Sequence, residues 1–442
     1  MVLLLAAAGL AFFAWRQTPR LVETFPAEGA VDVPAAAPLR ITFSAPMEAE
    51  SVSGRLSIEP ERPGTFAWQG STVIFTPSQP WPSGETVRVT LASGARAQTT
   101  LSFGLAGQSW AFTTAQTLLA YLWPASGPAD LYALDPLTGD IRRLTTDANI
   151  LDYTISADGL VVYYSAANSQ GGADLFALNR LSGAGADRLL ACGQTACRSP
   201  VVSPDGLRLA YESVPHLTAS RQMAQIWLYD LVTGTAAPLG DPAHETILPG
   251  WSPTGMLAYY DRTSQAYIIY DPQAENKISL PNQTGQGGSW SPDGRYFVAA
   301  EISLTRLDAA TEVGNSRVLR YDTATGAAVD LTQADDVEDA NPVFSTDGKL
   351  IAFGRKYLDP ARWTLGRPLW MMNADGSEVH PVMTDPLRVD YDLAWSLDGQ
   401  QLAFVRFDQG APTHPPELWL VNADGTEPLE LVVGGYAPQW VP

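Results

Sequence analysis

The chain has 442 residues, of which 45% are hydrophobic and 17% charged, so it is long enough for two or three domains or for a repeat array. Its 37 glycines and 34 prolines, together with 10% aromatic residues, favour many short strands joined by tight turns. The formal net charge of -20 repels a phosphate backbone and no basic stripe offsets it, which excludes nucleic acid as a partner.

The N-terminus is an uninterrupted apolar run from Val2 to Trp15. As a helix this run reaches about 21 Å, which is shorter than the ~30 Å hydrocarbon core of a bilayer and suits the apolar region of an export signal. No positive residue precedes the run, and no small-x-small cleavage site follows it. We therefore expect residues 1–20 to be a signal or membrane-anchor segment, uncleaved and with its true start further upstream. A buried N-terminal helix is the alternative.

Residues 21–114 predict a small β-sandwich, because short runs with alternating apolar residues are separated by Pro and Gly. The motifs of this region are Pro26-x-x-Gly29, Leu39-x-Ile41-x-Phe43-Ser44-x-Pro46-Met47, Phe75-x-Pro77 and Trp110-Ala111-Phe112-Thr113-Thr114. They resemble the SbsA-type bacterial Ig-like domain of envelope and surface-layer proteins. The resemblance implies a spacer or adhesive module with no catalytic role.

From residue 117 a repeat occupies the chain. Six Ser-x-Asp-Gly turns, one of them with Thr in place of Asp, begin at Ser156, Ser203, Ser252, Ser291, Ser345 and Ser396. Their spacing of 39 to 54 residues suits one four-stranded propeller blade. In four copies a bulky residue at the end of the first strand precedes the Ser and can wedge between neighbouring blades: Trp251, Trp290, Phe344 and Trp395.

The strands outside the six repeats decide how the ring closes. Three strands, from Leu118, Asp130 and Ile141, precede the first turn, and one strand with Trp440 follows the last repeat. We therefore predict that residues 117–442 form a seven-bladed β-propeller in which the C-terminal strand completes the first blade. The repeat resembles the TolB-like propeller repeat, many members of which have six blades, so a six-bladed ring is the alternative. The resemblance implies protein–protein contact in the bacterial envelope.

Cys192 and Cys197 are the only cysteines, and in an exported chain we expect them to form a disulfide. A zinc site would need more ligands. The four histidines, His216, His244, His380 and His414, are scattered without ligand spacing.

The loops between blade strands predict where a ligand would bind. The first-to-second and third-to-fourth strand turns are short and share one face of the propeller, the turn face; the longer connections share the opposite face, the loop face. Candidate binding residues on the loop face are His216, Arg306, Tyr357, Arg362 and Trp363. Carboxylates that we expect to line the channel mouth are Asp335, Asp336, Glu338, Asp339, Asp385 and Asp390. Such a ring could attract Ca²⁺ or a basic segment of a partner, although solvated acids explain most of these positions. We expect no other cofactor.

Several enzyme classes lack their signatures in this sequence. It contains no Gly-x-Ser-x-Gly, the turn that exposes a serine hydrolase nucleophile, and no Ser-x-Asp-x-Gly-x-x-Trp box typical of sialidases. Dispersed histidines do not supply the metal site of a polysaccharide lyase. We therefore expect an exported, membrane-anchored, non-catalytic binding protein of the bacterial cell envelope, whose loop face engages a protein partner. The alternatives are a glycan- or peptide-binding propeller and a carbohydrate-active enzyme that uses two loop-face carboxylates.

Overall fold

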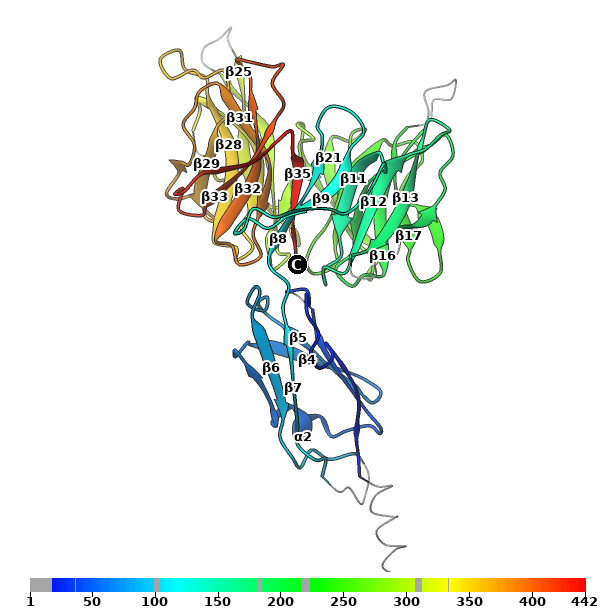
Figure 1. Ribbon diagram of the computed structural model, residues 1–442. Coiled ribbons are helices and arrows are strands. Elements are labelled where there is room, and N and C mark those ends of the chain that lie inside the picture. Colours follow the sequence, from blue (N-terminus) through cyan, green and yellow to red (C-terminus); the bar gives the residue numbers. More distant parts are fainter. Residues whose placement is uncertain are drawn as a thin grey trace, which may run out of the picture. The chain divides into compact units, whose positions relative to one another are not determined.

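The computed structural model describes residues 18–35, 37–98, 104–180, 185–215, 223–306, 312–332 and 334–442. The chain divides into two compact units, Met1–Thr117 with Pro442 and Leu118–Val441 (Figure 1). Both are built almost entirely of strands, so the all-β prediction is confirmed. Within the described ranges no helix is long and apolar enough to cross a bilayer, and the run Val2–Trp15 lies outside these ranges.

The N-terminal unit is a sandwich of two sheets. One sheet has the order β1-β2-β5-β4, with β1 (Leu21–Phe25), β2 (Leu39–Phe43), β4 (Gly64–Gln69) and β5 (Thr72–Pro77). The other has the order β3-β6-β7, with β3 (Leu56–Glu59), β6 (Thr86–Leu91) and β7 (Gln108–Thr113); a short helix, α2 (Ala49–Ser53), precedes β3. Alternate residues of β2 and β6 are buried in one apolar core, as their period-2 pattern predicts.

Beyond Leu118 the strands of the described residues form seven groups of four, and each group is called a blade. Blade 1 consists of β8 (Leu118–Trp123), β9 (Asp130–Leu134), β10 (Ile141–Arg143) and β35 (Tyr436–Val441). Blades 2 and 3, joined by one bridge into a single sheet, consist of β11 (Ile150–Ile155), β12 (Val161–Ala167), β13 (Ala173–Asn179), β14 (Asp187–Leu190), β15 (Ala196–Val202), β16 (Arg208–Val214), β17 (Gln225–Asp230) and β18 (Thr235–Pro238).

Blades 4 to 7 follow the same plan, with consecutive strands paired antiparallel. Blades 4 and 5 consist of β19 (Thr246–Trp251), β20 (Leu257–Asp261), β21 (Ala266–Asp271), β22 (Asn276–Pro281), β23 (Ser289–Trp290), β24 (Tyr296–Arg306), β25 (Glu312–Asp322) and β26 (Ala328–Asp330). Blades 6 and 7 consist of β27 (Val337–Phe344), β28 (Leu350–Tyr357), β29 (Leu369–Asn373), β30 (His380–Pro381), β31 (Arg388–Trp395), β32 (Gln401–Asp408), β33 (Glu417–Asn422) and β34 (Leu429–Val433).

The two ends of the propeller sequence meet in blade 1. Strand β35, drawn red in Figure 1, pairs antiparallel with β8, and Trp440 lies opposite Leu119. This pairing confirms the predicted closure by the C-terminal strand. It also covers an edge of β8 that would otherwise expose unpaired backbone groups.

The tryptophans before the repeat turns bind one blade to the next. The indole N–H of Trp251 donates to the carbonyl of Val201, 3.1 Å away on the first strand of the preceding blade. Trp290, Trp395 and Trp440 donate to the same relative position, on Gly250, Val343 and Ala394. A buried indole N–H needs an acceptor, so this bond explains why the wedge residue is mostly Trp. Phe344 holds the position in blade 6 and has no donor to offer.

The Ser-x-Asp-Gly turn is held by its own side chains. At Ser345 the hydroxyl donates to Asp347 Oδ1 (2.7 Å) and accepts from the backbone N–H of Leu350 (3.0 Å), while Gly348 adopts a positive φ of 74°. The same two side-chain bonds recur at Ser156, Ser203, Ser291 and Ser396. Each turn therefore satisfies its polar groups locally, which fixes the hairpin wherever the four-residue signature occurs.

Candidate functional site on the loop face

Two of the predicted site carboxylates lie inside blades. Asp339 lies in β27 of blade 6, is fully buried, and accepts two hydrogen bonds from the Arg355 guanidinium at 2.7 and 2.8 Å. The guanidinium also lies over the rings of Phe353 and Trp370, at 5.1 and 5.2 Å from their centres. Burial raises the pKa of Asp339, and the arginine opposes this shift.

Blade 7 repeats this arrangement. Asp390 is buried and accepts hydrogen bonds from Arg406 at 2.7 and 3.0 Å, and Arg406 lies over Phe404 and Trp419. Burial again raises the pKa of Asp390. Asp339 and Asp390 therefore stabilise their own blades and do not reach a ligand in solvent. The expectation that these two residues line the channel mouth is wrong, because each side chain points to an arginine on the next strand.

The other four predicted carboxylates lie on the loop face, and each has an arginine partner. The pairs are Asp335–Arg317, Asp336–Arg362, Glu338–Arg367 and Asp385–Arg388. The arginines neutralise the negative charge that would attract a cation. Over the part of the chain that the structure describes, no three His, Cys, Asp or Glu side chains come together in a group that could hold a metal ion.

The predicted residues Tyr357, Arg362 and Trp363 lie at the end of β28 and in the connection from β28 to β29 of blade 6. Trp363 is 53% exposed, and the Nζ of Lys356 lies 4.9 Å from its ring centre. The Arg362 guanidinium lies 4.2 Å from the ring centre of Tyr357 and forms an ion pair with Asp359 at 2.7 Å. This cluster of Lys356, Tyr357, Arg362 and Trp363 is called the blade 6 surface. It combines a large exposed aromatic ring with cationic side chains that lie over aromatic rings.

The remaining predicted residues contribute less to the described loop face. His216 lies outside the described residues, and Arg306 ends β24 with no described side chain. Cys192, in the connection from β14 to β15, forms a disulfide with Cys197 of β15. Asn168 Nδ2 donates to the carbonyl of Gly193 at 2.8 Å, so the second-to-third strand loop of blade 2 is held against the disulfide loop.

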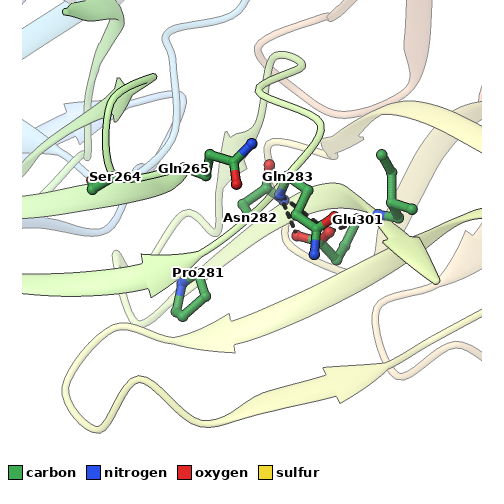
Figure 2. Close-up of a pocket in the computed structure, with 7 residues that line it drawn as sticks. Ser264, Gln265, Pro281, Asn282, Gln283 and Glu301 are labelled. Carbon is green, nitrogen blue, oxygen red and sulfur yellow. Dashed lines mark hydrogen bonds between the residues drawn. The ribbon is translucent and has the colours of Figure 1, made fainter. Parts of the chain in front are cut away.

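Sequence reasoning missed a pocket between blades 4 and 5, shown in Figure 2. Its walls include Gln265 from blade 4, Gln283 from the connection between the blades, and Glu301 from β24. Burial raises the pKa of Glu301. The sequence signal that could have found this residue is its register, because Glu301 follows its repeat serine by ten residues, as Arg355 and Arg406 follow theirs.

One comparison with known families concerns the N-terminal unit. Residues 16–114 match the family model described as the bacterial Ig-like domain. The N-terminal unit resembles a bacterial Ig-like domain. A search of curated proteins found no match to the chain.

Solved structures resemble the chain in fold. TolB from Acinetobacter baumannii is 14% identical, with 88% of this chain and 83% of that chain covered and a TM-score of 0.46. The β-propeller domain of the Trilobed protease from Pyrococcus furiosus is 15% identical, covering 64% of this chain and 84% of that one, with a TM-score of 0.46. The acylaminoacyl peptidase of Pyrococcus horikoshii is 13% identical with a TM-score of 0.51, covering 72% of this chain and 51% of the peptidase. At these identities the likeness concerns the fold alone.

Proposed function

We propose that the protein is an exported, envelope-associated binding protein without catalytic activity, and that the blade 6 surface contacts a protein partner. The Ig-like unit serves as a spacer, and the apolar run Val2–Trp15 holds the chain at the membrane. The N-terminal apolar composition and the match to a bacterial Ig-like domain support the location.

The exposure of Trp363 carries the proposal. Trp, Tyr and Arg side chains contribute most of the binding energy of protein interfaces, and they tend to lie where water can be excluded. Trp363 is more than half exposed and directly follows Arg362, whose guanidinium lies over the Tyr357 ring, so the three preferred residue types are close together along the chain. Tyr357 ends β28, and Arg362 and Trp363 lie on the loop that follows, so two strands of one blade support them and lower the ordering cost of binding.

The state of the carboxylates supports binding over hydrolysis. A glycosidase needs two carboxyl groups that face a substrate across a cleft. Among the predicted acids, two are buried and four are paired with arginine on the loop face. A glycan ligand stacked on Trp363 is the alternative within binding proteins.

A pull-down from envelope extract tests the proposal. We expect the wild-type protein to capture one partner in stoichiometric amount, and Trp363→Ala to weaken the affinity of the purified partner by about tenfold or more. Leu137→Ala is the control, because Leu137 is 85% exposed on the turn face of blade 1. Equal affinity of wild type and Trp363→Ala for the partner contradicts the proposal. Binding to a glycan panel that depends on Trp363 favours the alternative.

A further inference from the structure

The pocket between blades 4 and 5 is open to solvent on the loop face and has a volume of about 430 Å³. Figure 2 shows its lining residues, which are Ser264, Gln265, Pro281, Asn282, Gln283, Glu301 and Ile302. Most of them are polar, and Glu301 is the only charged one. The pocket is too polar for an apolar ligand and offers one carboxylate as its specific feature.

Glu301 is held in place by the backbone and has no ion pair among the described side chains. Its two carboxylate oxygens accept the backbone N–H of Gln283 at 3.1 and 3.0 Å, and Oε1 also accepts the N–H of Ile302 at 2.7 Å. The nearby Arg262 is engaged by Glu245 at 2.9 Å. Glu301 thus differs from Asp335, Asp336 and the other loop-face acids, which are neutralised by arginine.

The repeat explains why Glu301 lacks a partner. In blades 6 and 7 its position holds Arg355 and Arg406, and the opposing acid stands six residues before the repeat serine. In blade 5 that second position is Gly285, and an added Cβ there would lie 2.4 Å from the Tyr260 ring. The Tyr260 ring occupies the space that a side chain at Gly285 would need. Blade 5 therefore has a negative charge where blades 6 and 7 have a positive one, and its first strand has no room for an opposite charge.

The walls around Glu301 suit a hydrogen-bond donor. The Asn282 amide donates internally to the carbonyl of Ala300 at 2.8 Å, and its carbonyl oxygen accepts from Thr284 and Gly285. The exposed amides of Gln265 and Gln283 can turn their oxygens toward a ligand. Pro281 and Ile302 offer apolar surface for an alkyl stem. Burial raises the pKa of Glu301, and a bound cation would favour the charged carboxylate and so offset part of the cost of its desolvation.

We propose that this pocket binds an organic cation, an ammonium or guanidinium group, with Glu301 as its counter-ion. The inference rests on the proposed function in one respect, the source of the cation. If the protein has a protein partner, the cation is a lysine or arginine side chain of that partner. The pocket lies on the same face as the blade 6 surface, so one partner can engage both.

Isothermal titration calorimetry on the full chain tests the proposal. The probes are the capped peptide Gly-Gly-Arg-Gly-Gly, the same peptide with citrulline in place of arginine, and methylguanidinium. Citrulline keeps the shape of arginine and removes its charge. We expect the arginine peptide to bind about tenfold more tightly than the citrulline peptide. Tighter binding of the peptide than of methylguanidinium supports a partner's side chain as the source, and equal binding supports a free small cation.

Matched variants locate the site. Glu301→Gln should abolish the preference for arginine over citrulline, while Glu338→Gln, on the same face but paired with Arg367, should keep it. Should Glu301→Gln not fold, the wild-type preference should still decline as pH falls and Glu301 is protonated. Equal binding of the two peptides to the wild type, or an unchanged preference in Glu301→Gln, overturns the proposal. Retention of the preference in Trp363→Ala separates this pocket from the proposed function.

Discussion

Blades 5 and 6 share one backbone plan but differ in the charged side chains at one pair of positions. In blade 6 the register pair Asp339 and Arg355 is buried and self-neutralised, whereas blade 5 has Gly285 and Glu301 at the same distances from its repeat serine. The hairpin does not depend on this pair, because the turn signature and the wedge residue hold the blade without it. The pair position is therefore free to serve either stability within the chain or recognition of a ligand.

Blade 4 shows a third state of the same position. Thr246 and Asp261 form its register pair, and the counter-charge for Asp261 comes from His244 in the preceding loop, with Nδ1 and Oδ2 2.6 Å apart. At this position blade 4 therefore has a pH-sensitive pair of histidine and aspartate, blade 5 has a carboxylate without an ion pair among the described side chains, and blade 6 has a pair of arginine and aspartate.

Arg355→Met should destabilise the protein most. It leaves the Asp339 carboxylate buried without a cation, which costs about 3–5 kcal/mol of unfolding free energy. Chemical denaturation measures the loss. Adding Asp339→Asn should recover part of it, since a neutral amide can still accept from Thr332. A loss for Arg355→Met no larger than that for Glu301→Gln would mean that blades 5 and 6 do not differ as described.

Gly285→Asp, which restores the acid of blade 6 in blade 5, should destabilise the protein by at least about 2 kcal/mol. Gly285 has a φ of +56° and its Cβ would collide with the Tyr260 ring, so the new acid has no room to pair. Gly287→Asp is the control, because a Cβ at Gly287 meets nothing within 4 Å. Unchanged thermal unfolding of Gly285→Asp would show that Tyr260 yields the space.

His244 should make stability depend on pH. The hydrogen bond and the charge of Asp261, aided by Asp241, raise the pKa of His244 above its ordinary value. A raised histidine pKa gives stability that is fully present below the unfolded pKa of about 6.5 and is lost as pH rises through the folded pKa. The melting temperatures of wild type and His244→Asn should therefore converge as pH increases from about 5 to about 9. A difference between the two melting temperatures that stays constant over this pH range would contradict the pairing of His244 with Asp261.

Phe344→Trp should give the smallest effect, a gain of up to about 1 kcal/mol. Its indole N–H can reach the carbonyl of Ser289, which corresponds to the acceptors that the other wedge tryptophans use. The reverse change, Trp395→Phe, should lose a similar amount by removing the bond to Val343. Denaturant midpoints measure both changes, and a loss in Phe344→Trp would indicate overpacking beside blade 5.

The fold could be predicted in detail because its signals are local. The turn at Ser345 satisfies its own hydrogen bonds within a few residues, and the alternation Leu39, Ile41, Phe43 marks a buried face directly. The candidate site could be predicted only in part. The Arg362 guanidinium does lie over the Tyr357 ring, because the loop that contains Arg362 begins where Tyr357 ends β28. The burial of Asp339 in an ion pair could not be predicted, because its partner Arg355 is on the next strand.

The hairpins, the blade repeat and the closing role of the strand with Trp440 follow from the amino-acid sequence, because turn chemistry and period-2 burial act over short distances along the chain. The tertiary structure alone decided which charges are neutralised and which remain available. An ion pair depends on the register between strands and on desolvation, and residues such as Glu301 and Gln265 meet only when two blades pack side by side.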